Sequence, residues 1–276
     1  MPGRRELDTD MKETLDVDKV IRLAVCSDQR KDILLLMNEG MKSLRELRDE
    51  LKLSSPAIVH ALRELETSHI IRQDTNRNYM VTPLGRSAAR KVLDFQGAMA
   101  VLMRDEAFWF EHDMGGIPDH LFDKIGSLRD ATLIVGTPTD IFKALRHFVE
   151  LFRDSKVVKL VSPFYIQDIG ELVLEQFARQ QHVALVLTDE VSHHLIDEIG
   201  RERLSKARSE NLELYETRDN PKLVLVVADA FMALALYRLD GAFDYSYTLT
   251  SQDTEAIAWG QELFEYHVAS SESVVL

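Results

Sequence analysis

Cysteine is nearly missing from this sequence: Cys26 is the single one among 276 residues. One thiol excludes an intramolecular disulfide and a zinc site made of cysteines. Its neighbours Ile21, Ala24 and Val25 have helical spacing, so we expect Cys26 to be buried in a helix. At this length the chain can bury a sizeable core, and we expect two domains.

Long apolar runs and a secretory leader are also missing. The best candidate for a membrane helix, Leu223 to Tyr237, is interrupted by Asp229 and is shorter than the roughly 20 residues needed. No signal-peptide pattern opens the chain. We therefore expect a soluble, cytoplasmic protein without a membrane partner.

Motifs for catalysis or cofactor binding are missing as well. The sequence has no Walker loop, no GxGxxG, no GxSxG and no HExxH. His193 and His194 are adjacent, so they point to different sides of a helix, and His112, Asp113 and His120 lack a spacing specific to metal sites. The sequence predicts no catalytic residue, no cofactor and no metal, and thus no enzyme.

The net charge of −13 argues against nucleic acid as a partner, but the charge is unevenly placed. Residues 1–95 hold 17 Lys/Arg and 16 Asp/Glu, whereas the remainder holds 16 and 30. Within 42–91 there are 10 basic and 6 acidic residues. This asymmetry fits a DNA-contacting front end and an acidic body. A plain acidic protein with uneven surface charge is the alternative.

The stretch 54–65 predicts a helix with two different faces. Ser54 or Ser55 can cap its start with a side-chain oxygen, and Pro56 suits the first helical position, where no backbone N–H is needed. The apolar side chains expected to be buried on one face are Ala57, Ile58, Ala61, Leu62 and Leu65.

The opposite face of this helix carries Pro56, Val59, His60 and Arg63. Such a face can lie in the major groove of DNA. Arg63 can reach guanine O6 and N7, His60 a base edge or a phosphate, and Val59 a thymine methyl. The alternative is an ordinary amphipathic surface helix.

The residues before this helix complete a helix-turn-helix. Helical patterns at 15–26 and 28–38 come first, and Ser43 and Glu46 then have the spacing of a capping box. The short helix that follows is joined to the helix 54–65 by a turn of three or four residues, as the motif requires.

A β-hairpin, or wing, is predicted after this motif. Residues 70–73 and 79–82 are strand-like, and turn formers fill 74–78 between them. Arg77 at the tip, followed by Asn78, is placed to enter a minor groove or meet a phosphate. The whole is a winged-helix pattern, whose alternative use is protein contact.

The C-terminal part alternates strands with helices, which predicts an α/β domain with a mostly parallel sheet and a final antiparallel hairpin around 229–231. Strands are expected at 131–136, 156–162, 183–188, 212–216, 223–229 and 233–239. Helices are expected at 140–153, 168–179, 189–207 and 252–267.

Four segments follow from these patterns. They are a tail with the start of the first helix (1–19), a winged helix-turn-helix DNA-binding domain (20–84), a connecting and dimerisation helix (85–115) and an α/β effector-sensing domain (116–276). A connecting helix packed only on its own chain is the alternative to dimerisation.

An effector pocket is expected in the C-terminal domain. Ligands gather beyond the carboxyl ends of strands in such sheets, and 136–139, 162–165 and 188–190 follow such ends. The run 104–118, with three successive aromatic residues, resembles a hinge or pocket wall, or else a plug between the domains. As ligand-binding residues we select Trp109, His112, Tyr165 and Asp244, which offer a stacking surface and polar anchors.

Several motifs resemble those of a known family. The winged helix is similar to the ArsR-like helix-turn-helix of archaeal regulators. The motifs Phe108-Trp109-x-x-His112-x-x-x-x-Ile117-Pro118, Asp240-Gly241-x-x-Asp244 and Trp259-Gly260-x-x-Leu263-Phe264 resemble the methanogenesis-regulator type of C-terminal domain. The match extends over residues 20–267. It implies an archaeal transcription regulator with a phospholipase D-like sensor domain. Catalytic members of that fold use the motif His-x-Lys-x4-Asp. Here Ala184 occupies the lysine position, two residues after His182, so the resemblance does not imply catalysis.

We therefore expect a sequence-specific transcriptional regulator that binds double-stranded DNA as a homodimer and responds to an unidentified small-molecule effector. One alternative is a phosphodiesterase-like hydrolase with an accessory winged helix. Another is a winged helix that binds protein, whose affinity for DNA would show no salt dependence.

Overall fold

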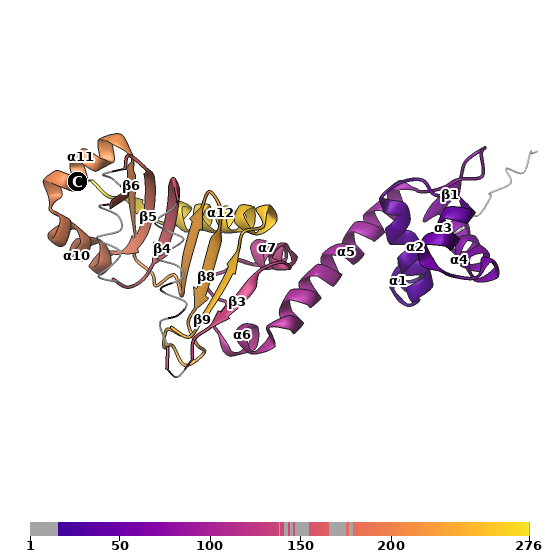
Figure 1. Cartoon of the computed structure of the whole chain (residues 1–276), viewed down its shortest axis with the longest axis horizontal. Coiled ribbons are helices and arrows are strands. Elements are labelled where there is room, and N and C mark those ends of the chain that lie inside the picture. The colour runs from indigo at the N-terminus through magenta and orange to yellow at the C-terminus, as the bar shows by residue number, and fades with distance from the viewer. Residues whose placement is uncertain are drawn as a thin grey trace, which may run out of the picture. The chain divides into compact units, whose positions relative to one another are not determined.

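The computed structural model describes residues 16–137, 139–140, 143, 146, 155–165, 175–176 and 179–275. The helices expected at 140–153 and 168–179 lie largely outside the described residues. The chain divides into two compact units, Met1–Gln96 and Gly97–Leu276, which are described separately (Figure 1).

Unit 1 is a bundle of short helices followed by a hairpin, and α5 leads out of it (Figure 1). Its elements are α1 Val17–Val25, α2 Asp28–Asn38, α3 Leu44–Leu51, α4 Ser55–Thr67, β1 Ile71–Gln73, β2 Tyr79–Val81 and α5 Pro83–Arg104. These confirm the expected order of helices and wing. Cys26 is not buried as expected, because α1 ends at Val25 and Cys26 is its exposed C-cap.

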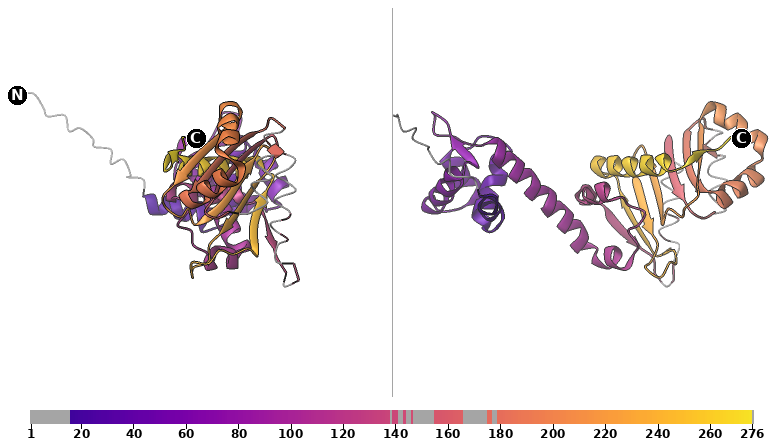
Figure 2. Two further views of the ribbon diagram at one scale, coloured as in Figure 1. Left: turned by 90° about the vertical axis from the view of Figure 1, so that its left-hand side faces the viewer. Right: turned by 180° about the vertical axis from the view of Figure 1, so that it is seen from behind.

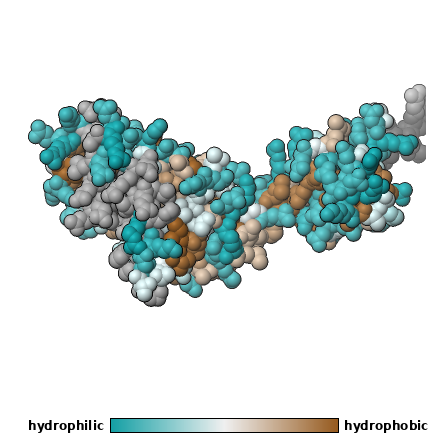
Figure 3. All heavy atoms as spheres, in the orientation of Figure 1, coloured by the Kyte–Doolittle hydropathy of each residue, from teal (hydrophilic) through white to brown (hydrophobic). Residues whose placement is uncertain are grey.

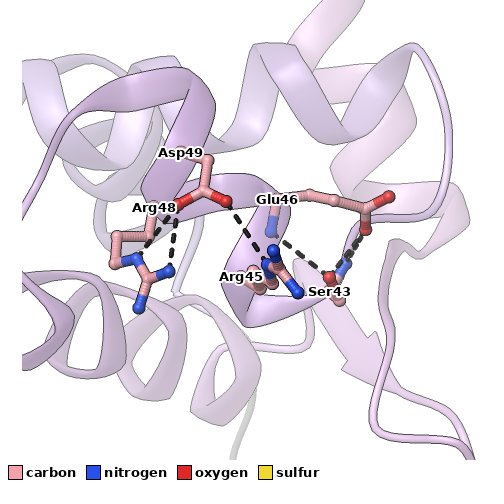
Figure 4. A network of polar contacts seen from close by, with 5 residues as sticks. All are labelled: Ser43, Arg45, Glu46, Arg48 and Asp49. Carbon is pink, nitrogen blue, oxygen red and sulfur yellow. Dashed lines mark hydrogen bonds and ion pairs between the residues drawn. The ribbon is translucent and has the colours of Figure 1, made fainter.

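The start of α3 confirms the predicted capping box (Figure 4). The Ser43 backbone N–H donates to Glu46 Oε2 at 2.7 Å, and the Glu46 N–H donates to Ser43 Oγ at 3.3 Å. The bond from the Ser43 backbone is the main reason why the pKa of Glu46 lies below its usual range. Further along α3, Asp49 accepts from Arg48 at 3.0 Å and pairs with Arg45 at 3.6 Å.

The turn between α3 and α4 is short, as expected. Lys52 ends α3 with φ +55°, and Ser54 caps α4 by accepting from the Ala57 N–H. Beyond it Ile58, Leu62 and their neighbours face inward. The buried core of unit 1 consists of Leu23, Ala24, Ile33, Leu34, Met37, Leu47, Ile58, Ala61, Leu62, Leu65, Ile70, Ile71, Ala89 and Val92.

The wing is fixed at its tip and at its base. At the tip, Asp74 Oδ1 accepts from the backbone N–H groups of Asn76 and Asn78, at 2.9 and 2.7 Å. At the base, the Thr82 N–H donates to the Ile70 carbonyl at 3.0 Å, and Thr82 Oγ1 caps α5 by accepting from the Gly85 N–H. A Cβ on Gly85 would lie 2.0 Å from that same carbonyl oxygen.

Unit 2 is built on a mixed sheet of eight strands within the described residues, in the order β10-β6-β5-β4-β7-β8-β9-β3. The strands are β3 Thr132–Val135, β4 Val157–Ser162, β5 His182–Thr188, β6 Leu212–Thr217, β7 Leu223–Ala228, β8 Met232–Leu236, β9 Tyr247–Ser251 and β10 Glu272–Ser273.

The prediction of a mostly parallel sheet is wrong. Only the pairings of β4 with β5 and of β5 with β6 are parallel, and every other described pairing is antiparallel. Connection length accounts for β7, β8 and β9, which follow one another through connections too short for a parallel crossover. The antiparallel pairs β4–β7, β3–β9 and β10–β6 join strands that are distant in the sequence. β7 and β8 form the hairpin predicted around 229–231, and the unpredicted β9 places β3 at the far edge.

Helices cover both faces of the sheet (Figures 1 and 2). Successive residues of a strand face opposite sides, so Val227 joins the core under α12 and Val226 the core under α10. The first face also packs against α6 Glu106–Glu111, α7 Asp119–Phe122, the 3-10 turn Ile125–Leu128 and α12 Thr254–Ala269. The second packs against α10 Asp189–Ile199 and α11 Arg201–Glu210.

The single helix expected at 189–207 is in fact two. Gly200 separates α10 from α11. Its φ of +91° is a backbone conformation that residues with a Cβ rarely adopt. Among the residues that the structure describes, no helix combines the length and the apolar character needed to cross a membrane.

Candidate nucleic-acid interface and effector site

The exposed face of α4 carries the side chains that the sequence placed there. Pro56, His60 and Arg63 are exposed and Val59 is half-buried, whereas Ile58 on the other face is fully buried. Ser54 is exposed and Ser55 is half-buried at the start of the helix. The face therefore presents side-chain donors and a methyl group, which is a suitable surface for DNA.

His60 lies beside an acid of its own helix, Glu64. Its Nδ1 lies 3.3 Å from Glu64 Oε2, and the same oxygen accepts from Arg30 Nη1 of α2 at 2.8 Å. Arg30 and Glu64 are 34 residues apart, so no local pattern could reveal the pair. Glu64 therefore lies between His60 and Arg30, and Arg63 carries the positive charge of this face.

The wing places one cation at its tip. Arg77 is exposed and has a positive φ of +64°. Its backbone N–H donates a hydrogen bond to the Asp74 carbonyl at 3.2 Å. Asn78, selected from the sequence as a contact residue, is half-buried, and its side-chain amide lies 3.5 Å from Asp74 Oδ2. Asn78 therefore stabilises the turn, which leaves Arg77 to project from it.

Among the residues that the structure describes, some of the Lys and Arg side chains in 42–91 are paired with carboxylates, and the others are unpaired and available to contact phosphates. Lys42 pairs with Glu50 at 2.9 Å, and Lys91 with Asp94 at 3.5 Å, while Arg45 and Arg48 share one acid of α3. Within the described residues no carboxylate pairs with Lys52, Arg63, Arg72, Arg77, Arg86 or Arg90. Lys52, in the turn before α4, is exposed and was not selected from the sequence.

In unit 2, Trp109, His112 and Asp244 lie together. His112 Nδ1 is 2.7 Å from the Phe108 carbonyl, which can only accept, so Nδ1 carries a proton. Its Nε2 lies 3.4 Å from Asp244 Oδ2, close enough for an ion pair but not aligned as a hydrogen bond. The Phe108 ring contacts both Trp109 and His112, at 4.9 and 5.1 Å.

Two nitrogens of this cluster lack a hydrogen-bond partner among the described residues. They are Trp109 Nε1 and His112 Nε2, on side chains that are 5% and 3% exposed. Such orphaned buried groups are rare because they cost free energy. Asp244 is fixed by accepting from the Ser246 N–H at 2.8 Å, so the acid stays beside the imidazole.

Tyr165 lies elsewhere in unit 2. Its ring packs on that of His194 of α10, with the ring centroids 4.3 Å apart. Tyr165 also lines a small apolar pocket together with Leu187 and Leu195. Its neighbour Phe164 instead reaches the loop before β9, with ring centroids 4.5 Å from Phe243. The structure thus brings together three of the four selected ligand residues and separates the fourth.

The three strand ends expected to line one crevice are not all neighbours in the sheet. The ends of β4 and β5 are neighbours, but β7, β8 and β9 lie between β4 and β3. The segment 136–139 is connected to the end of β4 through the loop before β9, where the Gly136 N–H donates to the Ser246 carbonyl at 2.7 Å and the ring centroids of Tyr245 and Phe164 are 5.9 Å apart. Its Pro138 lies outside the described residues.

Two ionisable groups anchor the segment after α6. Asp113 pairs with Lys222 at 2.9 Å and accepts from the Gly115 N–H, and both bonds, the one from Lys222 first, hold the pKa of Asp113 below its usual range. His267 Nε2 lies 3.0 Å from the Gly116 carbonyl, and burial lowers the pKa of His267. No cluster of metal-ligating side chains occurs in the described part of the chain.

Solved structures of regulators are only distantly similar. TrmBL2, described as an archaeal chromatin protein with a novel mode of DNA binding, is 15% identical and covers 94% of this chain and 100% of its own, with a TM-score of 0.42. An IcIR transcriptional regulator from Alicyclobacillus acidocaldarius is 13% identical over 92% of this chain and 97% of its own, with a TM-score of 0.25. Because these scores are below 0.5, no functional argument rests on them.

Sequence comparison identifies a family of related proteins. The Methanogenesis regulatory protein FilR1 of Methanothrix harundinacea (strain 6Ac) is 26% identical over 262 residues, which is 93% of this chain and 58% of that protein. The sequence model described as the N-terminal domain of FilR1 matches residues 18–100, and the one described as its middle domain matches residues 141–270. The chain therefore belongs to the family of the methanogenesis regulatory protein FilR1, of which it carries the N-terminal and middle domains.

Proposed function

We propose that the chain is a sequence-specific DNA-binding transcriptional regulator, with unit 1 as the reader and unit 2 as the sensor. The observation that supports this most is the exposed face of α4, where Arg63 has no acidic partner among the described residues. The relative and both matching family models carry the name of a regulatory protein.

Each contact has a distinct role in this proposal. Arg63 donates two hydrogen bonds to guanine O6 and N7, and Val59 contacts a thymine methyl in the major groove. Arg77 of the wing and Lys52 of the turn neutralise phosphates and fix the position of α4. Glu64 holds His60 toward the same groove, because Arg30 fixes the carboxylate from behind.

Two copies acting together are part of the proposal. Leu93 and Phe95 of α5 are 45% and 63% exposed, and Met103 near the end of the helix is 74% exposed. Apolar side chains are also visible on the surface over α5 in Figure 3. At about 100° per residue, Leu93 and Phe95 lie on opposite sides of α5, and Met103 lies between them. Pairing of α5 with a second copy through the side of Phe95 and Met103 would remove both from water, and a two-fold dimer would read two half-sites.

The sensor role rests on the cluster of Trp109, His112 and Asp244. An effector that accepts a hydrogen bond from Trp109 Nε1 and donates one to His112 Nε2, which accepts in the neutral ring, would satisfy the two orphaned nitrogens. Its binding energy would favour one state of the protein. In a thermal-shift screen of small metabolites, the effector should raise the melting temperature of the wild type but not of Asp244→Asn. Equal stabilisation of both would place the site elsewhere.

A phospholipase D-like sensor without catalysis is the form we propose for unit 2. Ala184, at the position where the catalytic motif has a lysine, is buried within β5. His182 pairs with Glu213 on the adjacent strand at 3.2 Å. These positions therefore stabilise the sheet in this proposal and do not act on a substrate.

The experiment is a selection of duplexes from a random pool by the full chain. The wild type should enrich one sequence, with two half-sites one helical turn, about 10–10.5 base pairs, apart if it is dimeric. Arg63→Ala with His60→Ala should lose the enrichment, at a cost of about 1–3 kcal/mol for the arginine contact.

The matched control is Arg218→Ala with His120→Ala, which removes the same side-chain types from exposed positions of unit 2. It should enrich the wild-type sequence. If the α4 variant also enriches that sequence with unchanged affinity, α4 is not the reading helix.

A further inference from the structure

A groove of about 810 Å³ lies within unit 1, on a side that the proposed reading surface does not use. It is formed by the C-terminal end of α2, the wing and the first turns of α5. Its lining residues are Met37, Asn38, Gly40, Met41, Arg72, Met80, Val81, Pro83, Arg86, Ser87, Arg90, Lys91 and Asp94. The volume is that of pockets for small molecules, about 300–1,000 Å³.

Strand alternation places the groove on the opposite side of the wing from α4. Gln73 pairs with Tyr79, which lies near Arg63 and Glu66 of α4. Arg72 pairs with Met80 one step along, so these two side chains point to the other face of the hairpin. A ligand in the groove and DNA on α4 therefore occupy different surfaces.

The rim of the groove is cationic, and the one acid among the described residues that line it, Asp94, is paired with Lys91. Arg86 and Arg90 are one helical turn apart on α5, so they lie on the same side and repel each other. Arg72 joins them from the wing, where its Nε contacts Met80 Sδ at 3.3 Å. No carboxylate pairs with these three guanidinium groups in the described part of the chain, and Asp94 is held by Lys91 at 3.5 Å.

The floor of the groove is apolar and adaptable. Met37, Met41 and Met80 line it together with Val81 and Pro83. Methionine side chains rotate freely and have a polarisable sulfur, so they can follow the shape of different apolar groups. Met41 is 59% exposed, which leaves this part of the floor open to an entering molecule.

We propose that this groove binds an amphipathic organic anion. Its carboxylate, sulfonate or phosphate head lies between Arg86, Arg90 and Arg72, whose planar guanidinium groups suit oxyanions. Its aliphatic or aromatic body lies on the methionine floor. This site is distinct from the effector cluster of unit 2 and does not depend on the DNA-binding function.

The test uses the full chain, without DNA, and the fluorescent probe 1-anilinonaphthalene-8-sulfonate, which has an aromatic body and one anionic head. Arg86→Gln with Arg90→Gln should weaken binding of the probe at least ten-fold. The control Arg45→Gln with Arg48→Gln removes the same charge from α3 and should bind like the wild type. The neutral analogue N-phenyl-1-naphthylamine should bind wild type and double variant alike.

Two further arms make the result decisive. Met41→Glu places an acid in the groove at an exposed position, so it should weaken the sulfonate probe while leaving the melting temperature unchanged. Decanoate should displace the probe from the wild type. Unchanged probe affinity in both groove variants would overturn the proposal. So would displacement by duplex DNA or by a glutamate-rich peptide but not by decanoate, which would assign the groove to a macromolecule.

Discussion

Two ionisable side chains of unit 2, His267 and Asp113, make the stability of the folded state depend on pH in different ranges. His267 is buried and donates through Nε2 to the Gly116 carbonyl, and burial lowers its pKa below the ordinary 6.5. The folded state therefore disfavours the protonated form. Its contribution to stability is complete above pH 6.5 and is lost as the pH falls from there toward the lower folded pKa, by at most about 1.4 kcal/mol per pH unit for one proton. Asp113 also has a lowered pKa, but its ordinary value is 3.8, so it acts at lower pH.

We accordingly predict that unit 2 loses stability between pH 7.5 and 5.5, and that His267→Gln, which keeps a donor for Gly116, loses less over that interval. Urea unfolding followed by fluorescence of Trp109 and Trp259, both in unit 2, measures the difference. An equal loss in the variant would show that another group is responsible.

Single residues were also where sequence reasoning was most limited. The helical pattern of 54–65 was enough to predict that Ile58 is buried and Arg63 exposed, because both follow from one helix alone. The bond between Arg30 and Glu64 joins separate helices, and the separation of Tyr165 from Trp109 depends on the packing of α10. Such contacts are properties of the tertiary structure and leave no local pattern.

At the level of elements, the junction between wing and α5 depends on one close approach. Gly85 stands where a Cβ would be 2.0 Å from the Ile70 carbonyl oxygen, which also accepts from the Thr82 N–H at 3.0 Å. Gly85→Ala should destabilise unit 1 by about 1–3 kcal/mol, because the backbone of the wing must shift. Gly40→Ala is the control, since no atom lies within 4 Å of its added Cβ, and it should change stability by less than about 0.5 kcal/mol.

Urea midpoints from far-ultraviolet circular dichroism compare these two variants with the wild type. Similar midpoints for both would show that the junction tolerates a methyl group and that the wing is not fixed there.

Elements with a strong period were predictable, and their pairing was not. The helices of unit 1 and strands β3 to β8 follow from apolar spacing and caps. β9 was missed because its threonines and serine dilute the apolar pattern of Tyr247–Ser251. The sheet is mainly antiparallel because β7, β8 and β9 pair in succession, and the strand pattern alone does not fix direction.

At the scale of the whole molecule, charge is distributed unevenly along the chain. Residues 1–95 have a net charge of +1 and the remainder −14. Because several cations of unit 1 are paired with acids, DNA affinity in our account depends on few side chains, Lys52, Arg63 and Arg77 above all. The acidic remainder repels phosphates, so the account predicts that DNA binding is sensitive to the loss of any one of these cations.

The salt dependence of duplex binding tests this claim most directly. The affinity of the wild type should fall linearly with salt on a double-logarithmic plot, by about 0.9 units of slope per phosphate neutralised. Lys52→Gln and Arg77→Gln should each reduce the slope by about one, and Arg218→Gln, an exposed arginine of unit 2, should leave it unchanged. An affinity that does not change with salt, or a slope that neither variant alters, would contradict the assignment of α4 and the wing as the DNA-binding surface.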